Sequence, residues 1–256
     1  MPKTRGDEYW TSVVDKFWAV MRAHFELRQD TSCGLHVHIS MLLGKYDLPQ
    51  LRKLAKAVIY WDSAVIMCAP PSRSARVSSF CGDNLQSSDA WDDYMGQGPL
   101  RGLKAAFEHI DTMDRDSIVA YVCPNGRRGW NFKPALATGS GSVEFRRPPG
   151  VVTAKKAKHW IAFVMCFVDM AMKYNPHDFM IKKPLIPNII SLILPEFESQ
   201  LLASAKALGL DMVLDARLHQ KDDPRSLYLH PTLRRNSAAM EYLQKIDQDY
   251  GCLSEP

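Results

Sequence analysis

Two histidines stand two residues apart in the segment SCGLHVHIS, residues 32–40. His36 and His38 alternate with apolar residues, which is the period of two that a half-buried β-strand shows. Both imidazole rings then lie on one face of the strand, about 6.5 to 7 Å apart, while the apolar side chains anchor the other face in a core. The spacing therefore predicts a rigid element that presents two nitrogen ligands, or two groups that carry protons.

A second strand with the same alternation occurs in VEFRRPPG, residues 143–150. Glu144 and Arg146 share one face there, and Val143 and Phe145 share the other. Taken alone, a His-x-His or a Glu-x-Arg pattern is more often a solvated strand face than a site. Each pattern here has an apolar opposite face and ends at Gly or Pro residues, so the two together favour a site. If the strands pair in one sheet, two imidazoles, a carboxylate and a guanidinium meet.

The composition predicts a single large domain, because 256 residues with 46% hydrophobic content can bury a full core. The 32 basic and 28 acidic residues give a formal charge of +4 without a concentrated basic patch, so we expect no nucleic-acid partner. The six cysteines form no Cys-x-x-Cys pair, which is typical of a reducing compartment. We find no secretory signal, and the most apolar window is shorter than the roughly 20 residues of a membrane span. We therefore expect a cytoplasmic protein with no membrane contact.

Hydrophobic periodicity predicts mostly helices around the two strands. Asp47 is placed to cap one of them. Residues 70–97 show little periodicity and predict a long loop, functional or mobile, that carries Arg73 and Arg76. Helices are expected over residues 7–25, 48–68, 98–113, 153–174, 195–208 and 235–249, and further strands over 25–29 and 117–123.

Three motifs in this order resemble those of a known family. They are CGLHVHIS at residues 33–40, RRGWNF at 127–132 and VEFRRPPG at 143–150. Together they resemble the amidoligases of the glutamine-synthetase-like carboxylate–amine ligase superfamily, and the fungal branch most of all. The resemblance covers about residues 8–180.

The resemblance implies an α+β fold in which an antiparallel sheet forms a funnel and helices pack on it. It implies an amidoligase-like domain over residues 1–180, with residues 181–256 as a helical C-terminal extension packed on that domain. It also implies a reaction in which ATP, with Mg²⁺ or Mn²⁺, phosphorylates a carboxylate and an amine displaces the phosphate to give an amide. The substrates would be small-molecule or peptide carboxylates and amines.

The resemblance also implies roles for single residues. His36 resembles the metal-binding histidine of the family segment, and His38 resembles the histidine near the nucleotide phosphates. Glu144 resembles the catalytic carboxylate that holds the metal ion beside the transferring phosphate. Arg146 resembles the catalytic arginine that contacts substrate or phosphoryl oxygens. Such a site suits phosphoryl transfer, which needs divalent cations and cationic donors around the phosphate.

Three further residues fall in the nucleotide and substrate segment of the family: Arg127, Arg128 and Asn131. Arginine suits this position because its planar fork matches a carboxylate or a phosphate better than an ammonium group does.

In one respect the chain departs from the family pattern. Family members begin with a Gly-x-Glu-x-Glu strand and a later Glu-Ser-Pro segment, which supply most metal ligands, and neither pattern precedes His36 here. We therefore expect a member that lacks the N-terminal glutamate strands, so that the domain over residues 1–180 is incomplete.

Two other hypotheses remain. One is a non-catalytic binding or scaffold domain that keeps the fold, with an uncovered sheet edge at which a second copy or a partner adds a strand. The other is a His-x-His and Glu metal centre of a redox or hydrolytic enzyme. The nearest acid after the histidines is Asp47, past a Gly turn, which argues against the common barrels that use such a triad.

Overall fold

The computed structural model describes residues 7–30, 32–42, 44–73, 80–84, 99–175 and 189–214. These residues form six α-helices, two short 3₁₀ turns and a sheet of three strands, so the predicted α+β class is confirmed. In chain order the elements are α1 (Asp7–His24), β1 (Val37–Ile39), α2 (Leu48–Cys68), η1 (Pro71–Arg73), α4 (Pro99–Thr112), α5 (Arg115–Val122), β2 (Trp130–Asn131), η3 (Lys133–Ala135), β3 (Val143–Phe145), α6 (Ala154–Lys173) and α8 (Ile189–Leu208).

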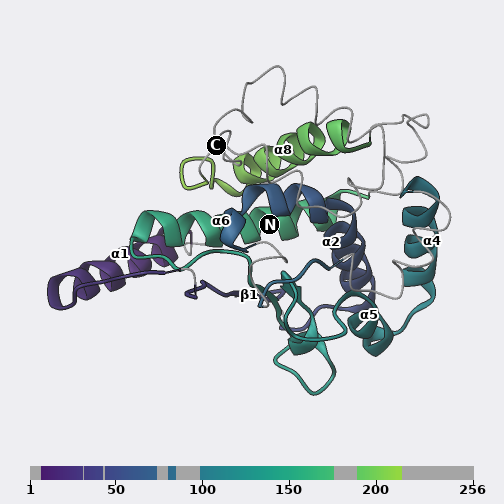
Figure 1. The fold of residues 1–256 in the computed structure, drawn as a ribbon, viewed down its shortest axis with the longest axis horizontal. Helices are drawn as coiled ribbons and strands as arrows, with labels where there is room; N and C mark the ends of the chain where they lie inside the picture. Colours follow the sequence, from purple (N-terminus) through teal and green to yellow (C-terminus); the bar gives the residue numbers. More distant parts are fainter. Residues whose placement is uncertain are drawn as a thin grey trace, which may run out of the picture.

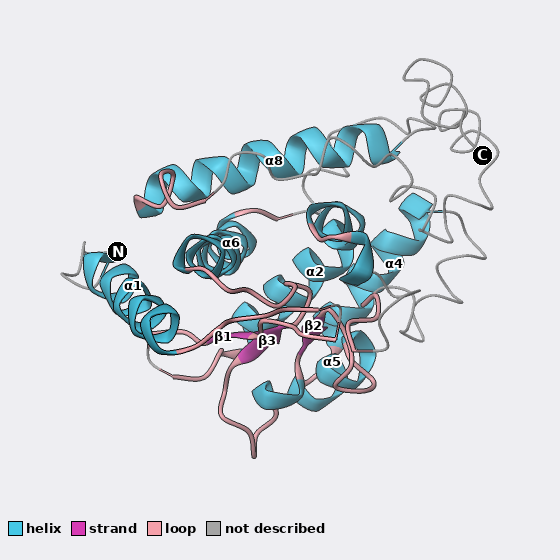
Figure 2. Ribbon diagram, turned by 60° about the vertical axis from the view of Figure 1, so that its left-hand side comes forward, coloured by secondary structure: helices cyan, strands magenta, loops and turns pink. Residues whose placement is uncertain are grey.

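The helices cover the sheet in layers (Figure 1, Figure 2). α8 lies over α6 and α2, and the sheet lies on the other side of α6 from α8. Aromatic side chains join the sheet to α6: the Phe145 ring is 5.5 Å from Phe163, and the Trp130 ring is 4.6 Å from Phe167. The apolar face of the sheet is therefore fixed in the core, which leaves the opposite face for polar side chains.

The two predicted motif strands pair in one sheet. The strand order is β1-β3-β2 and both pairings are antiparallel. In the register, His38 of β1 and Asn131 of β2 both lie opposite Glu144 of β3. Because side chains of directly opposed residues lie on the same face, this register brings three polar groups together.

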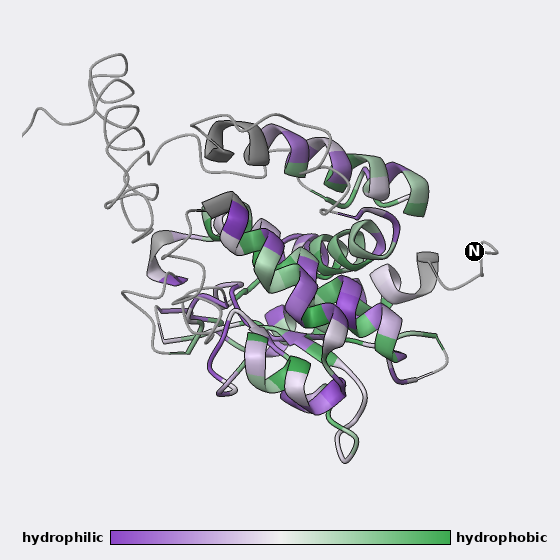
Figure 3. Cartoon of the chain, turned by 90° about the vertical axis from the view of Figure 1, so that its right-hand side faces the viewer, coloured by the Kyte–Doolittle hydropathy of each residue, from purple (hydrophilic) through white to green (hydrophobic). Residues whose placement is uncertain are grey.

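Local sequence explains where the long helices begin. Asp47 caps α2 and forms a reciprocal capping box with Gln50, as the sequence predicts for this aspartate. Thr153 caps α6 by accepting a hydrogen bond from the Lys156 amide. In Figure 3 the described helices carry both hydrophobic and hydrophilic residues, as helices with one buried face do. None of these helices combines the length and the apolar character needed to cross a membrane.

Two predicted strands are wrong. Residues 115–122 form helix α5 because Asp114 caps it, accepting a 2.8 Å hydrogen bond from the Ser117 amide. Ile118 and Val122, four residues apart, are buried on one side of this helix. Residues 25–29 form no strand, since the chain there is mostly exposed and pairs with no other described segment.

Helix α1 is only partly covered. Asp15 pairs with Lys158 of α6 at 2.8 Å and ties the helix to the body. Val13, Phe17 and Val20 of this helix are 45–57% exposed. Arg76, most of the predicted loop and the predicted helix 235–249 lie outside the described residues.

Candidate functional site

Glu144 stands at the centre of the candidate site, in the middle strand of the sheet. Its side chain is only 7% exposed. Oε1 lies 2.8 Å from Arg146 Nη1 and 2.8 Å from His36 Nδ1, and Oε2 accepts a 2.7 Å hydrogen bond from Asn131 Nδ2. Protein donors therefore hold both oxygens of this buried carboxylate.

His36 lies beside Glu144 and Arg146. Burial lowers the pKa of His36, Arg146 lowers it further, and Glu144 opposes them only in part. Its Nδ1 lies 2.8 Å from Glu144 Oε1 and 3.5 Å from Arg146 Nη1, so the tautomer of the ring decides whether this nitrogen meets the carboxylate as a donor or the guanidinium as an acceptor. The side chain is 37% exposed, so part of the ring is within reach of a ligand from solvent.

His38 is oriented by a pair of serines. Its Nδ1 lies 3.1 Å from Ser142 Oγ, which lies 2.9 Å from Ser140 Oγ. Its Nε2 is 3.6 Å from Glu144 Oε1, too far for a good hydrogen bond. His38 thus faces the carboxylate without binding it. Apart from its position one residue before β3, no signal in the sequence singled out Ser142.

Arg146 is held at two points. Nη1 donates to Glu144 Oε1, and Nε donates to the Phe80 carbonyl at 3.2 Å. The side chain is 16% exposed, and its Nη2 group has no hydrogen-bond partner within the described part of the chain. No described residue therefore competes with a bound anion for this group.

Asn131 supports the carboxylate from the other side. Its Oδ1 accepts from the Lys133 amide at 3.0 Å and lies 3.5 Å from Cys123 Sγ, so the amide group is fixed with its Nδ2 toward Glu144. The residue is only 8% exposed. Its contacts are those of a residue that orients Glu144.

Arg127 and Arg128 do not reach Glu144. The Arg127 guanidinium lies 5.8 Å from the centre of the Phe80 ring. Arg128 is half-buried next to Gly82, and burial lowers its pKa. Both therefore flank the segment 80–84 at the edge of the site, and the structure brings together only five of the seven predicted site residues: His36, His38, Asn131, Glu144 and Arg146.

A metal ion does not fit at Glu144 as its surroundings stand. Arg146 Nη1 occupies the position beside Oε1 where a cation would bind, and Asn131 takes Oε2. Among the described residues, no group of three or more His, Cys, Asp or Glu side chains is arranged to hold a metal ion. The metalloenzyme hypothesis gains no support from this geometry.

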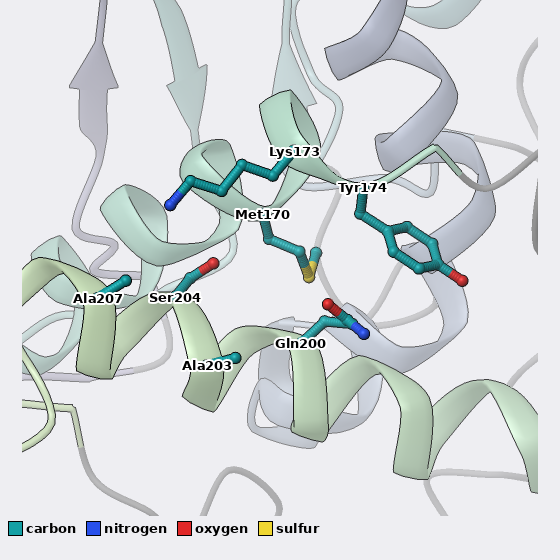
Figure 4. A pocket seen from close by; sticks show the side chains of 7 residues that line it. All are labelled: Met170, Lys173, Tyr174, Gln200, Ala203, Ser204 and Ala207. Carbon is teal, nitrogen blue, oxygen red and sulfur yellow. The ribbon is translucent and has the colours of Figure 1, made fainter. Parts of the chain in front are cut away.

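A separate cavity of about 270 Å³ lies between α6 and α8. Figure 4 shows Lys173, Met170 and Gln200 around it, and Lys173 also pairs with Asp169 at 2.6 Å. Its lining contains no residue of the sheet and no predicted site residue; it comprises Met170, Lys173, Tyr174, Gln200, Ala203, Ser204 and Ala207.

An α+β fold with a carboxylate, an arginine and two histidines on one small antiparallel sheet is what the three sequence motifs imply for an amidoligase. The family model described as "Putative amidoligase enzyme" matches residues 1–168, more than half of the chain. The chain belongs to this family, and the predicted resemblance is confirmed. No curated protein and no solved structure shows significant similarity to the chain. The matched range contains the five residues that meet at the site, whereas α8 lies beyond it.

Proposed function

We propose that this chain acts as an ATP-dependent carboxylate–amine ligase, with the site around Glu144 and Arg146. The observation that carries the proposal is that the three sequence motifs, all within the range matched by the family model, meet at one buried carboxylate. The substrates would be a small-molecule or peptide carboxylate and an amine. Family membership supports the class of reaction, and the contacts of the site support the roles of its residues.

The reaction asks for cationic donors around an anion. A carboxylate oxygen attacks the terminal phosphate of ATP, ADP leaves, and an amine then displaces phosphate from the acyl phosphate and loses a proton. Charge collects on phosphoryl oxygens during the first transfer. Arg146 is placed for this role, because Glu144 and the Phe80 carbonyl fix its guanidinium while no described residue bonds its Nη2.

Magnesium would enter with ATP. Phosphate oxygens are the hard ligands Mg²⁺ prefers, and Mg²⁺ commonly binds proteins through substrate phosphates and few side chains. The described residues supply no metal group of their own, so we assign no side chain to the ion. The His36 side chain, which is 37% exposed and has its Nδ1 3.5 Å from Arg146 Nη1, would contact the bound substrate or nucleotide.

One observation favours a second candidate, a non-catalytic binding domain that keeps the fold. Glu144 already has Arg146, Asn131 and His36 as partners, so the carboxylate is balanced without any ligand. A site that has lost its chemistry would keep such a set for stability alone.

Isothermal titration with ATP and Mg²⁺ separates the two candidates. The ligase should bind ATP or a non-hydrolysable analogue at millimolar concentration or below, and Arg146→Lys should weaken binding at least threefold, because the compact ammonium lacks the arginine fork. Arg115→Lys is the matched control, since Arg115 binds the carbonyls of Ala135 and Tyr46 away from the site. A folded chain that binds neither nucleotide would refute the ligase proposal.

A further inference from the structure

A second arginine follows Arg146 in the sequence, and it is entirely buried. Arg147 Nη2 donates to Asp83 Oδ1 at 2.6 Å and lies 3.6 Å from Asp62 Oδ1 of α2. Its Nη1 donates to the Arg73 carbonyl at 3.3 Å. Burial disfavours the charge of Arg147, but the two carboxylates outweigh it and its pKa is raised. Arg147 is therefore a charged core residue whose partners come from three separate segments.

Arg146 and Arg147 both bind the segment of residues 80–84. Residues 80–84 supply both the Phe80 carbonyl that holds Arg146 Nε and the Asp83 carboxylate that holds Arg147 Nη2. Arg146 does so at the site, where it also binds Glu144, whereas Arg147 does so in the core. The position of Phe80 and the position of the Arg146 guanidinium are thus linked through the backbone of both segments.

Backbone bonds complete this link. The Gly82 amide donates to the Arg127 carbonyl at 2.9 Å, and the Gly129 amide donates to the Gly82 carbonyl at 2.7 Å. The Arg146 amide in turn donates to the Gly129 carbonyl at 2.8 Å. Asn84 binds both the amide and the carbonyl of Trp130. Segment 80–84 is therefore joined to the strands that carry Asn131 and Glu144.

Two glycines of the motifs leave space for the buried guanidinium groups of Arg73 and Arg147, which together form a buried arginine layer. A Cβ atom on Gly129 would lie 2.5 Å from Arg147 Nε, and one on Gly34 would lie 2.7 Å from Arg73 Nη2. Arg73 is 2% exposed and donates from Nη2 to the Arg146 carbonyl at 2.6 Å. These glycines thus let buried guanidinium groups pack directly against the backbone of the motifs.

We propose that Arg147 is a positioning residue of the site, which holds segment 80–84 through Asp83 so that the Phe80 carbonyl fixes Arg146 against Glu144. The role of Arg147 in function rests on the proposed ligase reaction, whereas the structural connection from Arg147 through segment 80–84 to Arg146 does not. Arg147 itself touches no ligand, since it is fully buried.

Solvent exchange of the Arg146 Nε–H, followed by NMR, tests the link without any ligand. In Arg147→Lys and in Asp83→Asn we expect at least tenfold faster exchange of this proton in a chain that still unfolds cooperatively. Arg115→Lys, which removes an arginine with no bond to segment 80–84, should leave the exchange within twofold. Unchanged exchange in a folded Arg147→Lys or Asp83→Asn chain would overturn the proposal.

The wild-type chain gives a second test should neither variant fold. The Gly82 and Gly129 amides and the Arg146 Nε–H should share one opening step, with protection that falls in parallel as denaturant is added. Exchange of the Arg146 Nε–H through structural openings at least a hundredfold more frequent than those that expose the two amides would overturn the link.

Nucleotide titration adds the functional readout. If the wild type binds ATP with Mg²⁺, Arg147→Lys should weaken that binding at least threefold while Arg115→Lys does not, and equal binding would refute the role in function. If the wild type binds no ATP, the ligase proposal fails, while the exchange result still decides whether Arg147 positions Arg146.

Discussion

Replacing Glu144 by glutamine should destabilise the chain, because this carboxylate accepts hydrogen bonds from Arg146 and Asn131 and lies 2.8 Å from His36 Nδ1. Glutamine keeps one acceptor oxygen and places an NH₂ group where the other was, so one donor faces another donor. Loss of the charge-assisted bond to Arg146 costs about 1.5 to 3 kcal/mol, and an unsatisfied buried donor adds about 1 kcal/mol. Partial hydration of Arg146, which is 16% exposed, offsets some of this. We expect a loss of about 2 to 4 kcal/mol in the free energy of unfolding.

Thermal unfolding followed by circular dichroism measures this effect. For a chain of this size a loss of 2 to 4 kcal/mol lowers Tm by about 4 to 16 °C. Glu108→Gln is the matched control, because Glu108 is 61% exposed and only 3.8 Å from Lys104 on the helix surface; it should change the stability by less than about 0.5 kcal/mol. An unchanged Tm in Glu144→Gln together with a large loss of ATP affinity would refute this reasoning, because Glu144 would then matter for the ligand and not for stability.

Three further outcomes follow from the contacts. The pKa of His36 lies below its ordinary 6.5, so the unfolded chain binds the proton more tightly; the free energy of unfolding should therefore rise with pH through the window just below 6.5, and His36→Gln should flatten this slope in urea titrations. Gly34→Ala should cost about 1 to 3 kcal/mol, because its Cβ would lie 2.7 Å from Arg73 Nη2, whereas Gly126→Ala, with nearest atoms at 3.6 Å, should cost far less in the same assay. Asp114→Ala should lower the stability by about 1 kcal/mol if it caps α5, and full stability in thermal unfolding would contradict the cap.

The pairing of the two motif strands could be predicted because each strand alternates apolar and polar residues and so has one apolar and one polar face. Alternation in β1 and β3 places the polar residues on one face wherever the strands pair. Val37 and Phe145 are cross-strand neighbours, as are His38 and Glu144, so the apolar and polar faces match along the pair. The ligand roles of His36, His38 and Glu144 remain predictions, since no contact here involves a ligand.

Helix α5 shows where periodicity misled. Residues 117–123 contain Ile118, Val119 and Val122 in a short apolar run, and such a run fits a buried strand as well as a buried helix. The deciding signal was Asp114, three residues before Ser117, since an N-cap aspartate satisfies the free amides of a first helical turn. Length did not help, because α5 has only 8 residues.

Position along the chain did not reveal which arginines face the site. Arg127 and Arg128 share a motif with Asn131, but they precede β2 and turn toward segment 80–84, whereas Asn131 lies in the strand beside Glu144. The direction of a loop side chain depends on what packs against the loop, and the periodicity of the motif contains no information about that.

The buried arginine layer did leave one signal in the sequence. Asp62 stands in the apolar run of α2 and is 1% exposed, and an aspartate at such a position requires a buried cation or hydrogen-bond donors. The sequence alone could not identify Arg147 as that cation, because Arg147 directly follows the site residue Arg146. Its second partner, Asp83, lies in a segment without periodicity. The carboxylates that hold the core side of the site thus come from α2 and from segment 80–84. Only the three-dimensional structure shows that Arg146 and Arg147, adjacent in one motif, lie on different sides of the site: Arg146 binds Glu144, and Arg147 binds Asp83 in the core.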